Sequence, residues 1–169
     1  FNLNFNHDYG VFEVGMDKKG EINLLSKIIK PDIGIITNIS YAHAKNFKNI
    51  KQIALAKAEI MNNINIDGFI VLNADDKFFY LHKKIAIKKK LNIISFGKNK
   101  KANIKFIGIK REKRRYKVSL KINKKKKDFY TSNNFENFVK NLMGVIAIIS
   151  IFKNPLELDK NIFFKFRTP

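Results

Sequence analysis

"DIGIITNISYAHAKNFKNIKQIALAKAEIMNN", residues 32–63, is the stretch that decides the fold. It opens with a continuous apolar run over 32–38, the pattern of a strand buried on both faces of a parallel sheet. From Ile50 to about residue 62, apolar residues recur with the 3.6-residue period of a helix that packs one face on a core. A buried strand followed by an amphipathic helix is the unit from which parallel α/β sheets are built.

Segments of these two kinds alternate along the chain. We expect strands at 9–15, 32–38, 68–76 and 92–97, and helices at 20–30, 50–62, 77–90 and 135–152. Between about 93 and 131 the pattern changes to alternating apolar and polar residues, typical of antiparallel strands with one face in water. The predicted fold class is α/β, a parallel sheet with crossover helices plus a small antiparallel β meander. We expect one domain over 1–152 and a linker over 153–169.

The chain is strongly basic, with 34 Lys and Arg against 14 Asp and Glu and a net charge of +20. Such a charge suggests a polyanionic partner. However, Lys, Ile and Asn are abundant everywhere, as a coding bias toward AT-rich codons would produce, and dense basic runs occur at "KREKRR" (110–115) and "KKKK" (124–127). A nucleic-acid-binding module built on the basic meander (104–130) is therefore an alternative from a different class, and no nucleic-acid partner is expected.

Several classes of protein are excluded by composition. There are no cysteines, which excludes disulfides and thiolate metal sites. The longest apolar run, residues 142–152, is too short to cross a bilayer, and the polar N-terminus does not resemble a signal peptide. We expect a cytoplasmic protein without membrane insertion.

Polar residues follow the apolar runs at the points where the predicted strands end. Ligands of open parallel sheets bind at the carboxyl ends of the strands. We therefore expect these side chains to converge on one edge: Glu13, Asn38, His43 and Asn73, with Asp75 and Asp76 beside them. Carboxylate and imidazole groups together suit Mg²⁺ or Mn²⁺.

Each of these residues also has a structural interpretation. Glu13 could cap the next turn, Asn73 with the aspartates after it could form the N-cap of the following helix, and a lone His43 is more often structural. Lys57 lies inside the apolar stripe of the helix at 50–62, where burial would lower its pKa. Alternatively, its ammonium could extend out of the core into water.

Four motifs occur in a familiar order: "FEVGMDKKGEI" (12–22), "ITNISYAH" (36–43), "AKAEI" (56–60) and "LNADD" (72–76). Together they resemble the central ATP-binding domain of the Mur ligase family. The Glu-x-Gly-x-x-x-x-Gly-Glu-Ile spacing is similar to the MurF type, the members that add D-alanyl-D-alanine. The resemblance covers about residues 9–152. Other Mur-type ligases, MurE-like or folylpolyglutamate synthase-like, are the alternatives within the class, and "GMDKKGEI" argues against both.

The resemblance implies a function and a set of roles. The activity is that of a ligase that uses ATP to join D-alanyl-D-alanine to UDP-N-acetylmuramoyl-tripeptide through an acyl phosphate, in peptidoglycan synthesis, as a monomer in a bacterial cytoplasm. Lys57 would be carbamylated and would bind magnesium with Glu13 and His43, which together hold two Mg²⁺ ions. Asn38, as a catalytic residue, would contact either the substrate or a residue that binds the metal. The nucleotide would lie near three residues: Asn73, Asp75 and Asp76.

The chain departs from the family in two respects. Before its late helix the family usually has a His in a Gly-x-His-Asn-like stretch, whereas this region reads "NNFENFVKN" (133–141), with Asn137 in the place of the His. The other departure concerns the phosphates of ATP. The family's phosphate loop, Gly-x-x-x-x-Gly-Lys followed by Thr or Ser, occurs nowhere in this sequence. That loop cradles phosphates with backbone N–H groups and a lysine. We therefore expect a partial central domain that is inactive by itself, with residues 153–169 leading toward a C-terminal domain outside this sequence.

Overall fold

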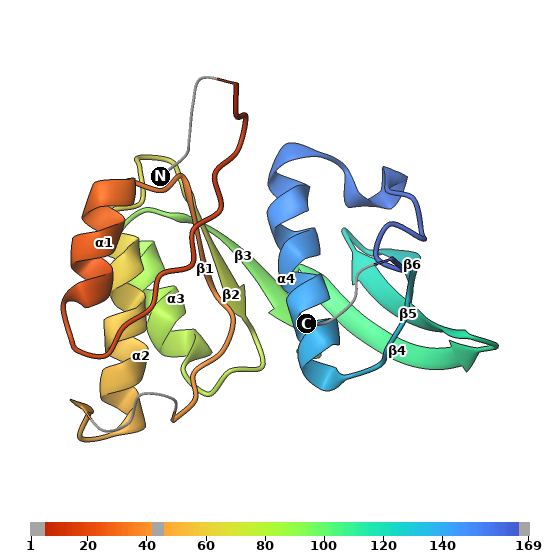
Figure 1. Cartoon of the computed structure of the whole chain (residues 1–169), viewed down its shortest axis with the longest axis horizontal. Coiled ribbons are helices and arrows are strands. Elements are labelled where there is room, and N and C mark those ends of the chain that lie inside the picture. Colours follow the sequence, from red (N-terminus) through yellow and green to blue (C-terminus); the bar gives the residue numbers. More distant parts are fainter. Residues whose placement is uncertain (1–5, 42–45, 166–169) are drawn as a thin grey trace.

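The computed structural model describes residues 6–41 and 46–165 (Figure 1). Its strands form one six-stranded sheet in which strands adjacent in sequence are adjacent in space. The strands are β1 (Ile33–Ile36), β2 (Phe69–Asn73), β3 (Asn92–Gly97), β4 (Ile104–Glu112), β5 (Arg115–Ile122) and β6 (Lys125–Thr131). The order β1-β2-β3-β4-β5-β6 joins a parallel half to an antiparallel half, and this confirms the predicted fold class.

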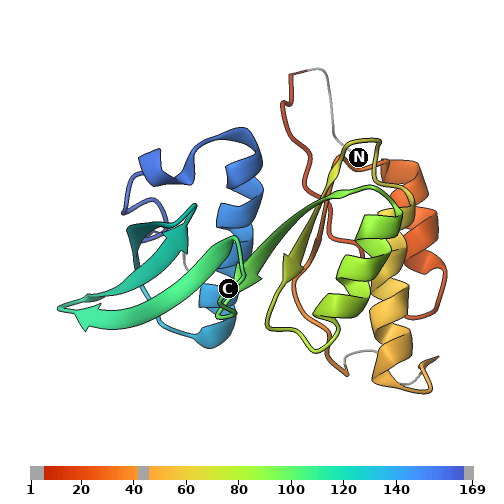
Figure 2. The ribbon, with the colours of Figure 1, turned by 180° about the vertical axis from the view of Figure 1, so that it is seen from behind.

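Helices cover both faces of the parallel half. One face carries α1 (Glu21–Ile29), α2 (Ile50–Ala58) and α3 (Phe79–Lys88), and the other carries α4 (Glu136–Phe152), as Figures 1 and 2 show. A short 3₁₀ helix, η2 (Glu59–Asn62), continues α2. Within β2, Ile70 and Leu72 belong to the core beneath α1–α3, whereas Val71 belongs to the core beneath α4. Burial on both faces explains the continuous apolar runs in the sequence.

The antiparallel half is a meander of β4, β5 and β6. β3 and β4 pair in parallel over only two residue pairs, Phe96↔Ile104 and Gly97↔Lys105. Along β5, Val118, Leu120 and Ile122 are fully buried. Of the residues between them, Lys121 is exposed, whereas Ser119 is 8% exposed and bonds to Asp128. The prediction of one wet face is therefore matched at Lys121 and not at Ser119.

The prediction of a strand at 9–15 is wrong. The structure assigns no strand anywhere in that stretch. A strand requires a backbone ladder with a neighbour, and β1, the outermost strand of the sheet, pairs only with β2 among the described residues. The apolar side chains of the stretch are packed only in part, since Val11 is 97% exposed and Tyr9 is 64% exposed. The ring of Tyr9 meets that of Phe152 at 5.1 Å between centroids, and Val14 packs against the core beneath α1–α3.

The first part of the expected linker is packed against the meander. After α4, the 3₁₀ helix η3 (Pro155–Glu157) leads to Phe163, which is buried and meets the ring of Phe129 at 5.5 Å. The amide of Tyr130 donates to the Lys160 carbonyl at 2.7 Å. These contacts pack residues up to about 163 against the core beneath α4. The domain boundary at 152 stays a prediction.

None of the helices in the described residues combines the length and the apolar character needed to cross a bilayer.

Candidate active site

Lys57 is placed at the carboxyl end of β1 by the packing of α2. Ile53 and Ala54 are buried on the core side of this helix, and Asn49 caps its first turn by accepting from the Gln52 amide at 3.1 Å. Lys57 lies one turn beyond Ile53, and its Nζ donates to the Asn38 carbonyl at 2.9 Å. The cation therefore sits where the chain leaves the sheet, half-buried between the helix and the strand end.

Two other ionisable groups surround this lysine. Asp76 accepts from the Ile39 amide at 3.0 Å through Oδ2 and from the Phe78 amide at 2.8 Å through Oδ1. His82, only 2% exposed, has its Nε2 3.0 Å from the Ala54 carbonyl, which requires a proton on that nitrogen. The three groups thus tie α2, α3 and the ends of β1 and β2 together.

Burial shifts the protonation of both basic groups toward the neutral form. Desolvation lowers the pKa of Lys57, and the nearby Asp76 carboxylate opposes part of this shift. Desolvation likewise lowers the pKa of His82, against the opposing effects of the Ala54 carbonyl and Asp76. The lowered pKa of Lys57 agrees with its position in the apolar stripe.

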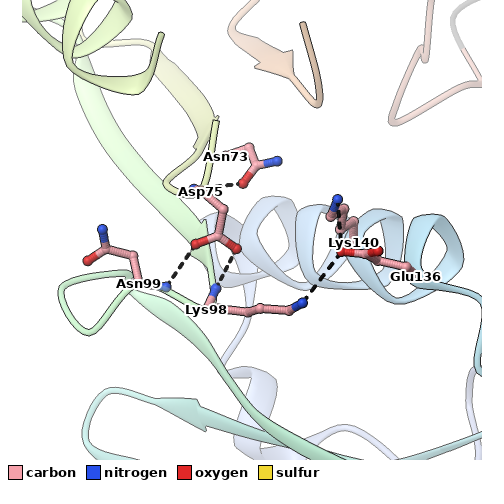
Figure 3. A network of polar contacts seen from close by, with 6 residues as sticks. All are labelled: Asn73, Asp75, Lys98, Asn99, Glu136 and Lys140. Atoms are coloured by element: carbon pink, nitrogen blue, oxygen red, sulfur yellow. Dashed lines mark hydrogen bonds and ion pairs between the residues drawn. The ribbon is translucent and has the colours of Figure 1, made fainter. Parts of the chain in front are cut away.

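Asn73 and Asp75 hold the ends of three strands together. Asn73 donates from Nδ2 to the Thr37 carbonyl at 3.0 Å and accepts from the Asp75 amide at 3.0 Å. The Asp75 carboxylate in turn accepts from the Lys98 amide at 2.6 Å and the Asn99 amide at 2.9 Å, as Figure 3 shows. Asp75 therefore fastens the end of β2 to the turn that follows β3.

This network continues to the start of α4. Lys98 Nζ lies 3.4 Å from Glu136 Oε1, and Lys140 Nζ lies 3.2 Å from the same oxygen (Figure 3). Gly97 is needed at this junction, because it has φ +145° and an added Cβ would lie 2.7 Å from the Asp75 carboxylate. The strand ends and the α4 N-terminus are thereby held in one polar layer.

The structure brings most of the predicted site residues to one edge of the sheet. Five of them gather at the ends of β1 and β2: Asn38, Lys57, Asn73, Asp75 and Asp76. Glu13 is exposed in the segment before α1, and its side chain takes no part in the hydrogen bonds or ion pairs that join the described residues. His43 lies outside the described residues.

The N-cap interpretation of Asn73 and the aspartates is not what the structure shows. The N-cap of α3 is Phe78, without a side-chain cap. Asn73 and Asp75 instead bond to other strand ends, and Asp76 bonds to Ile39 as well as to the turn before α3. Within residues 6–41 and 46–165, no three His, Cys, Asp or Glu side chains gather closely enough to hold a metal ion.

The sequence did not identify Glu59 as a site residue. Its carboxylate accepts from the Gly20 amide at 3.0 Å and from the Asn23 amide at 3.2 Å. The first turn of α1 has no side-chain cap of its own, so Glu59 supplies the negative charge that a helix N-terminus favours. Glu59 lies in "AKAEI", two residues after Lys57, but nothing in the sequence indicates a partner 36 to 39 residues away. The segment that carries Lys57 thereby also fixes the "GMDKKGEI" loop.

Comparison with known proteins agrees with this fold and these motifs. The model of the Mur ligase middle domain matches residues 2–149. The chain therefore belongs to the Mur ligase family, as the sequence motifs indicated.

Similar proteins and structures within the family indicate the MurF type. Over 155 residues the chain is 36% identical to the UDP-N-acetylmuramoyl-tripeptide--D-alanyl-D-alanine ligase of Rickettsia prowazekii, covering 90% of this chain and 34% of that protein. A crystal structure of MurF from Acinetobacter baumannii aligns with a TM-score of 0.79 and 26% identity over 88% of this chain and 32% of that one. MurF from Thermotoga maritima in complex with ADP shares the fold, with a TM-score of 0.76 and 18% identity over 89% of this chain and 34% of that one. The chain thus spans about a third of the length of these relatives, and the expected resemblance to the MurF type is confirmed.

Proposed function

We propose that this chain is part of an ATP-dependent ligase that joins D-alanyl-D-alanine to UDP-N-acetylmuramoyl-tripeptide in peptidoglycan synthesis, acting as a monomer in a bacterial cytoplasm. The names of the similar proteins support this substrate pair. Because one fold can carry many functions, the proposal also needs support from the site itself. The observation that carries it is Lys57, whose amine is half-buried at the carboxyl edge of the sheet and bonded to the Asn38 carbonyl.

The reaction is a phosphoryl transfer followed by an acyl transfer. A carboxylate oxygen of the tripeptide attacks the γ-phosphorus of ATP, the bond to the β-phosphate bridging oxygen breaks, and ADP leaves. The amine of D-alanyl-D-alanine then attacks the acyl carbon, loses a proton and expels phosphate from the tetrahedral intermediate, giving an amide. Such a sequence depends mainly on positioning and on stabilising phosphoryl charge.

Lys57 is proposed to act as a carbamate. A neutral lysine amine attacks CO₂ and loses a proton, which converts a cationic side chain into a carboxylate. The lowered pKa of Lys57 favours the neutral amine that this reaction needs. The carbamate nitrogen keeps one hydrogen, so the bond to the Asn38 carbonyl can remain and orient the new carboxylate.

The residues present fit part of a Mg²⁺ site. The Lys57 carbamate, Glu13 and His43 would supply the hard oxygen and nitrogen donors that this ion accepts. Of these three donors, only Glu13 carries a carboxylate without modification, and within residues 6–41 and 46–165 no three His, Cys, Asp or Glu side chains gather closely enough to hold a metal ion. Bound Mg²⁺ would stabilise charge on the transferred phosphoryl group.

Asn73, Asp75 and Asp76 are proposed to border the nucleotide by holding the loops around it. Their side chains already accept backbone N–H groups from the ends of three strands and from the turn before α3. In this role they fix the walls of an ATP site, and remaining lone pairs on their oxygens stay free for ribose or adenine. The ADP complex of the Thermotoga maritima protein, which has the same fold, is consistent with a nucleotide at this domain.

The carbamate can be tested in the full-length enzyme. We expect Lys57→Ala to abolish nearly all ADP release in the presence of both substrates, and Lys57→Arg not to restore it, because arginine cannot bind CO₂. Acetate or formate at high concentration should partly rescue the alanine variant. Wild-type enzyme incubated with isotopically labelled bicarbonate should show a carbamate carbon signal that both variants lack.

Lys51→Ala is the matched control, since Lys51 is an exposed lysine of the same helix. It should keep both the activity and the carbamate signal. Wild-type activity in Lys57→Arg would show that Lys57 needs only its stem and its positive charge, and would end the carbamate proposal.

The chain of residues 1–169 alone is expected to release no phosphate from ATP with both substrates, since it lacks the phosphate loop. Clear turnover in such an assay would contradict the interpretation as a partial site.

A further inference from the structure

The basic run "KREKRR" (110–115) forms the tip of a projecting hairpin. Glu112 pairs with Arg115 across a two-residue turn, Lys113–Arg114, that joins β4 to β5. Figures 1 and 2 show this hairpin extending along the long axis of the molecule, away from α1–α3 and beyond α4. The tip is therefore the part of the described chain that is best placed to meet another surface.

Positive charge is concentrated in the segment that contains this tip. Residues 98–128 include 15 Lys or Arg against 2 Asp or Glu, so 31 of the 169 residues carry +13 of the net +20. Four cationic residues of the tip are exposed: Lys110, Arg111, Lys113 and Arg114. The one acidic residue at the tip, Glu112, is paired with Lys117 at 2.5 Å. Local acidic groups therefore leave most of the positive charge uncompensated.

Two isoleucines next to the tip are exposed. Ile107 is 49% and Ile109 is 38% exposed, and the pairing register of β4 with β5 shifts between Phe106 and Gly108. An apolar pair flanked by cationic side chains is the combination found at surfaces that contact the interface of a membrane. The isoleucines would enter the boundary between headgroups and acyl chains, while the cations remain among the headgroups.

The turn itself is not built for stability. Lys113 has φ +54°, a left-handed conformation that glycine and asparagine adopt at lower cost than lysine. A lysine at such a position adds charge at the most projecting point of the hairpin at the expense of backbone strain.

We propose that the β4–β5 hairpin tip, Ile107 to Lys117, docks on an anionic phospholipid surface. Nucleic acid is disfavoured because single-stranded recognition uses exposed aromatic faces. Over 104–131, every residue of which is described, no aromatic side chain is exposed, and the guanidinium of Arg115 covers the Tyr130 ring at 3.5 Å. Lipid headgroups require only cations and an apolar edge, both of which the tip presents. This proposal does not depend on the ligase activity.

Sedimentation with vesicles tests the proposal on the full chain. Vesicles of phosphatidylcholine with phosphatidylglycerol should bind the protein at low salt, and vesicles of phosphatidylcholine alone should not. The variant Lys110→Gln/Arg111→Gln/Lys113→Asn/Arg114→Gln should bind on the order of tenfold to a hundredfold more weakly. Added salt should weaken binding of the wild-type protein.

The matched control removes four exposed cations from α3 and its C-cap: Lys83→Gln/Lys84→Gln/Lys88→Gln/Lys89→Gln. It should retain wild-type vesicle binding. An equal loss in this control would show that total charge, not the hairpin, determines binding, and would overturn the proposal. Absence of wild-type binding to the anionic vesicles at low salt would also overturn it.

Two smaller changes separate the components of the surface. Lys113→Asn alone should raise the melting temperature while weakening vesicle binding, because it relieves the backbone and removes a cation. Ile107→Thr/Ile109→Thr should weaken binding while leaving its salt dependence unchanged. Tighter binding of a labelled single-stranded RNA than of the anionic vesicles, lost in the four-site tip variant, would assign the tip to nucleic acid and contradict the proposal.

Discussion

The parallel half and the meander use their polar residues in opposite ways. At the ends of β1, β2 and β3, the carboxylates of Asp75 and Asp76 and the amide of Asn73 bond to backbone groups of other segments. On the meander, the cationic side chains mostly face water, with the exception of Lys127, which donates to the Leu156 and Leu158 carbonyls. The two acidic residues, Glu112 and Asp128, form ion pairs with Lys117 and Lys126. One half therefore fixes geometry with its polar groups, and the other presents charge.

This difference has consequences for how each half tolerates substitution. Where a side chain satisfies buried or constrained backbone groups, its loss exposes several hydrogen-bonding groups at once. Where a side chain extends into solvent, its loss changes the local potential and little else. The substitutions below test this contrast, each against a matched control.

The largest effect is expected from adding one methyl group at Gly68. A Cβ there would lie 2.6 Å from the Asp32 carbonyl and 2.8 Å from the Asn65 carbonyl, and neither backbone atom can move without displacing the start of β2. Gly68→Ala should lower the free energy of unfolding by about 3 kcal/mol, measured by urea denaturation. Gly108→Ala in the meander, where nothing lies within 4 Å of the new atom, should change it by less than about 0.5 kcal/mol. If the two variants lost the same free energy of unfolding, the parallel half and the meander would not differ in their tolerance of substitution.

A smaller loss is expected at Asp75. Asp75→Ala removes the acceptor of the Lys98 and Asn99 amides and should cost about 2 kcal/mol in the free energy of unfolding. Asp67→Asn is a control with the same change in charge. Asp67 is exposed with φ +60°, a conformation that asparagine tolerates, so its stability should stay within about 0.5 kcal/mol of wild type. If Asp75→Ala left the free energy of unfolding unchanged, water would be able to replace the carboxylate as acceptor of both amides without cost.

The buried histidine should make the parallel half sensitive to acid. Burial lowers the pKa of His82 below its ordinary value of 6.5, so the unfolded chain binds the proton first as the pH falls. The contribution of neutral His82 to the free energy of unfolding is therefore fully present above about pH 6.5. It is lost as the pH falls from there through the lowered pKa of the folded state. His82→Gln, which keeps a donor for the Ala54 carbonyl, should reduce the difference between denaturation midpoints at about pH 7.5 and about pH 5.5.

His7→Gln replaces a histidine in the exposed N-terminal segment and serves as the comparison for this measurement. If both variants reduced the pH difference to the same extent, the acid sensitivity could not be assigned to His82.

The smallest effect should be a gain, at the second turn of the meander. Asn123 and Lys124 join β5 to β6 with φ +48° and +68°, the conformation of a type I′ turn, for which Asn-Gly is preferred. Lys124→Gly should therefore raise the free energy of unfolding by about 0.5 kcal/mol. Lys126→Gly, two residues further along in β6, should lower it by a similar amount, since glycine weakens a strand interior. Thermal melts of the pair should move in opposite directions.

The sequence predicted the elements whose pattern is set by burial. The continuous run at 32–38 and the periodic stretch from Ile50 are determined by a core on both faces of the sheet, and both appear as β1 and α2. The stretch 9–15 has an equally apolar composition but forms no strand. Its side chains are also buried only in part, with Val11 97% exposed. Both burial and strand formation depend on a neighbour that the local sequence does not reveal.

The candidate site was predicted in part, for a similar reason. Asn38, Asn73 and the aspartates follow apolar runs, so their arrival at one edge follows from the parallel topology. Glu59 and His82 act through contacts with residues about 30 to 40 positions away, which no local pattern encodes. The packing of residues 155–163 against the meander was not expected for the same reason, since the contacts of Phe163 and Lys160 with β6 are long-range.

The joint between the two halves has a consequence for how the molecule opens. β3 and β4 share only two residue pairs, and α4, which contacts β2, β3 and β4, spans this joint. When α4 separates from the sheet in a local opening, few backbone hydrogen bonds hold the meander to the parallel strands. Each half can then exchange its amide protons on its own timescale. In deuterium-exchange measurements, amides of β5 and β6 should become labelled as one group and those of β2 and β3 as another. The chain then behaves as two cooperative folding units that share a single helix as their coupling element.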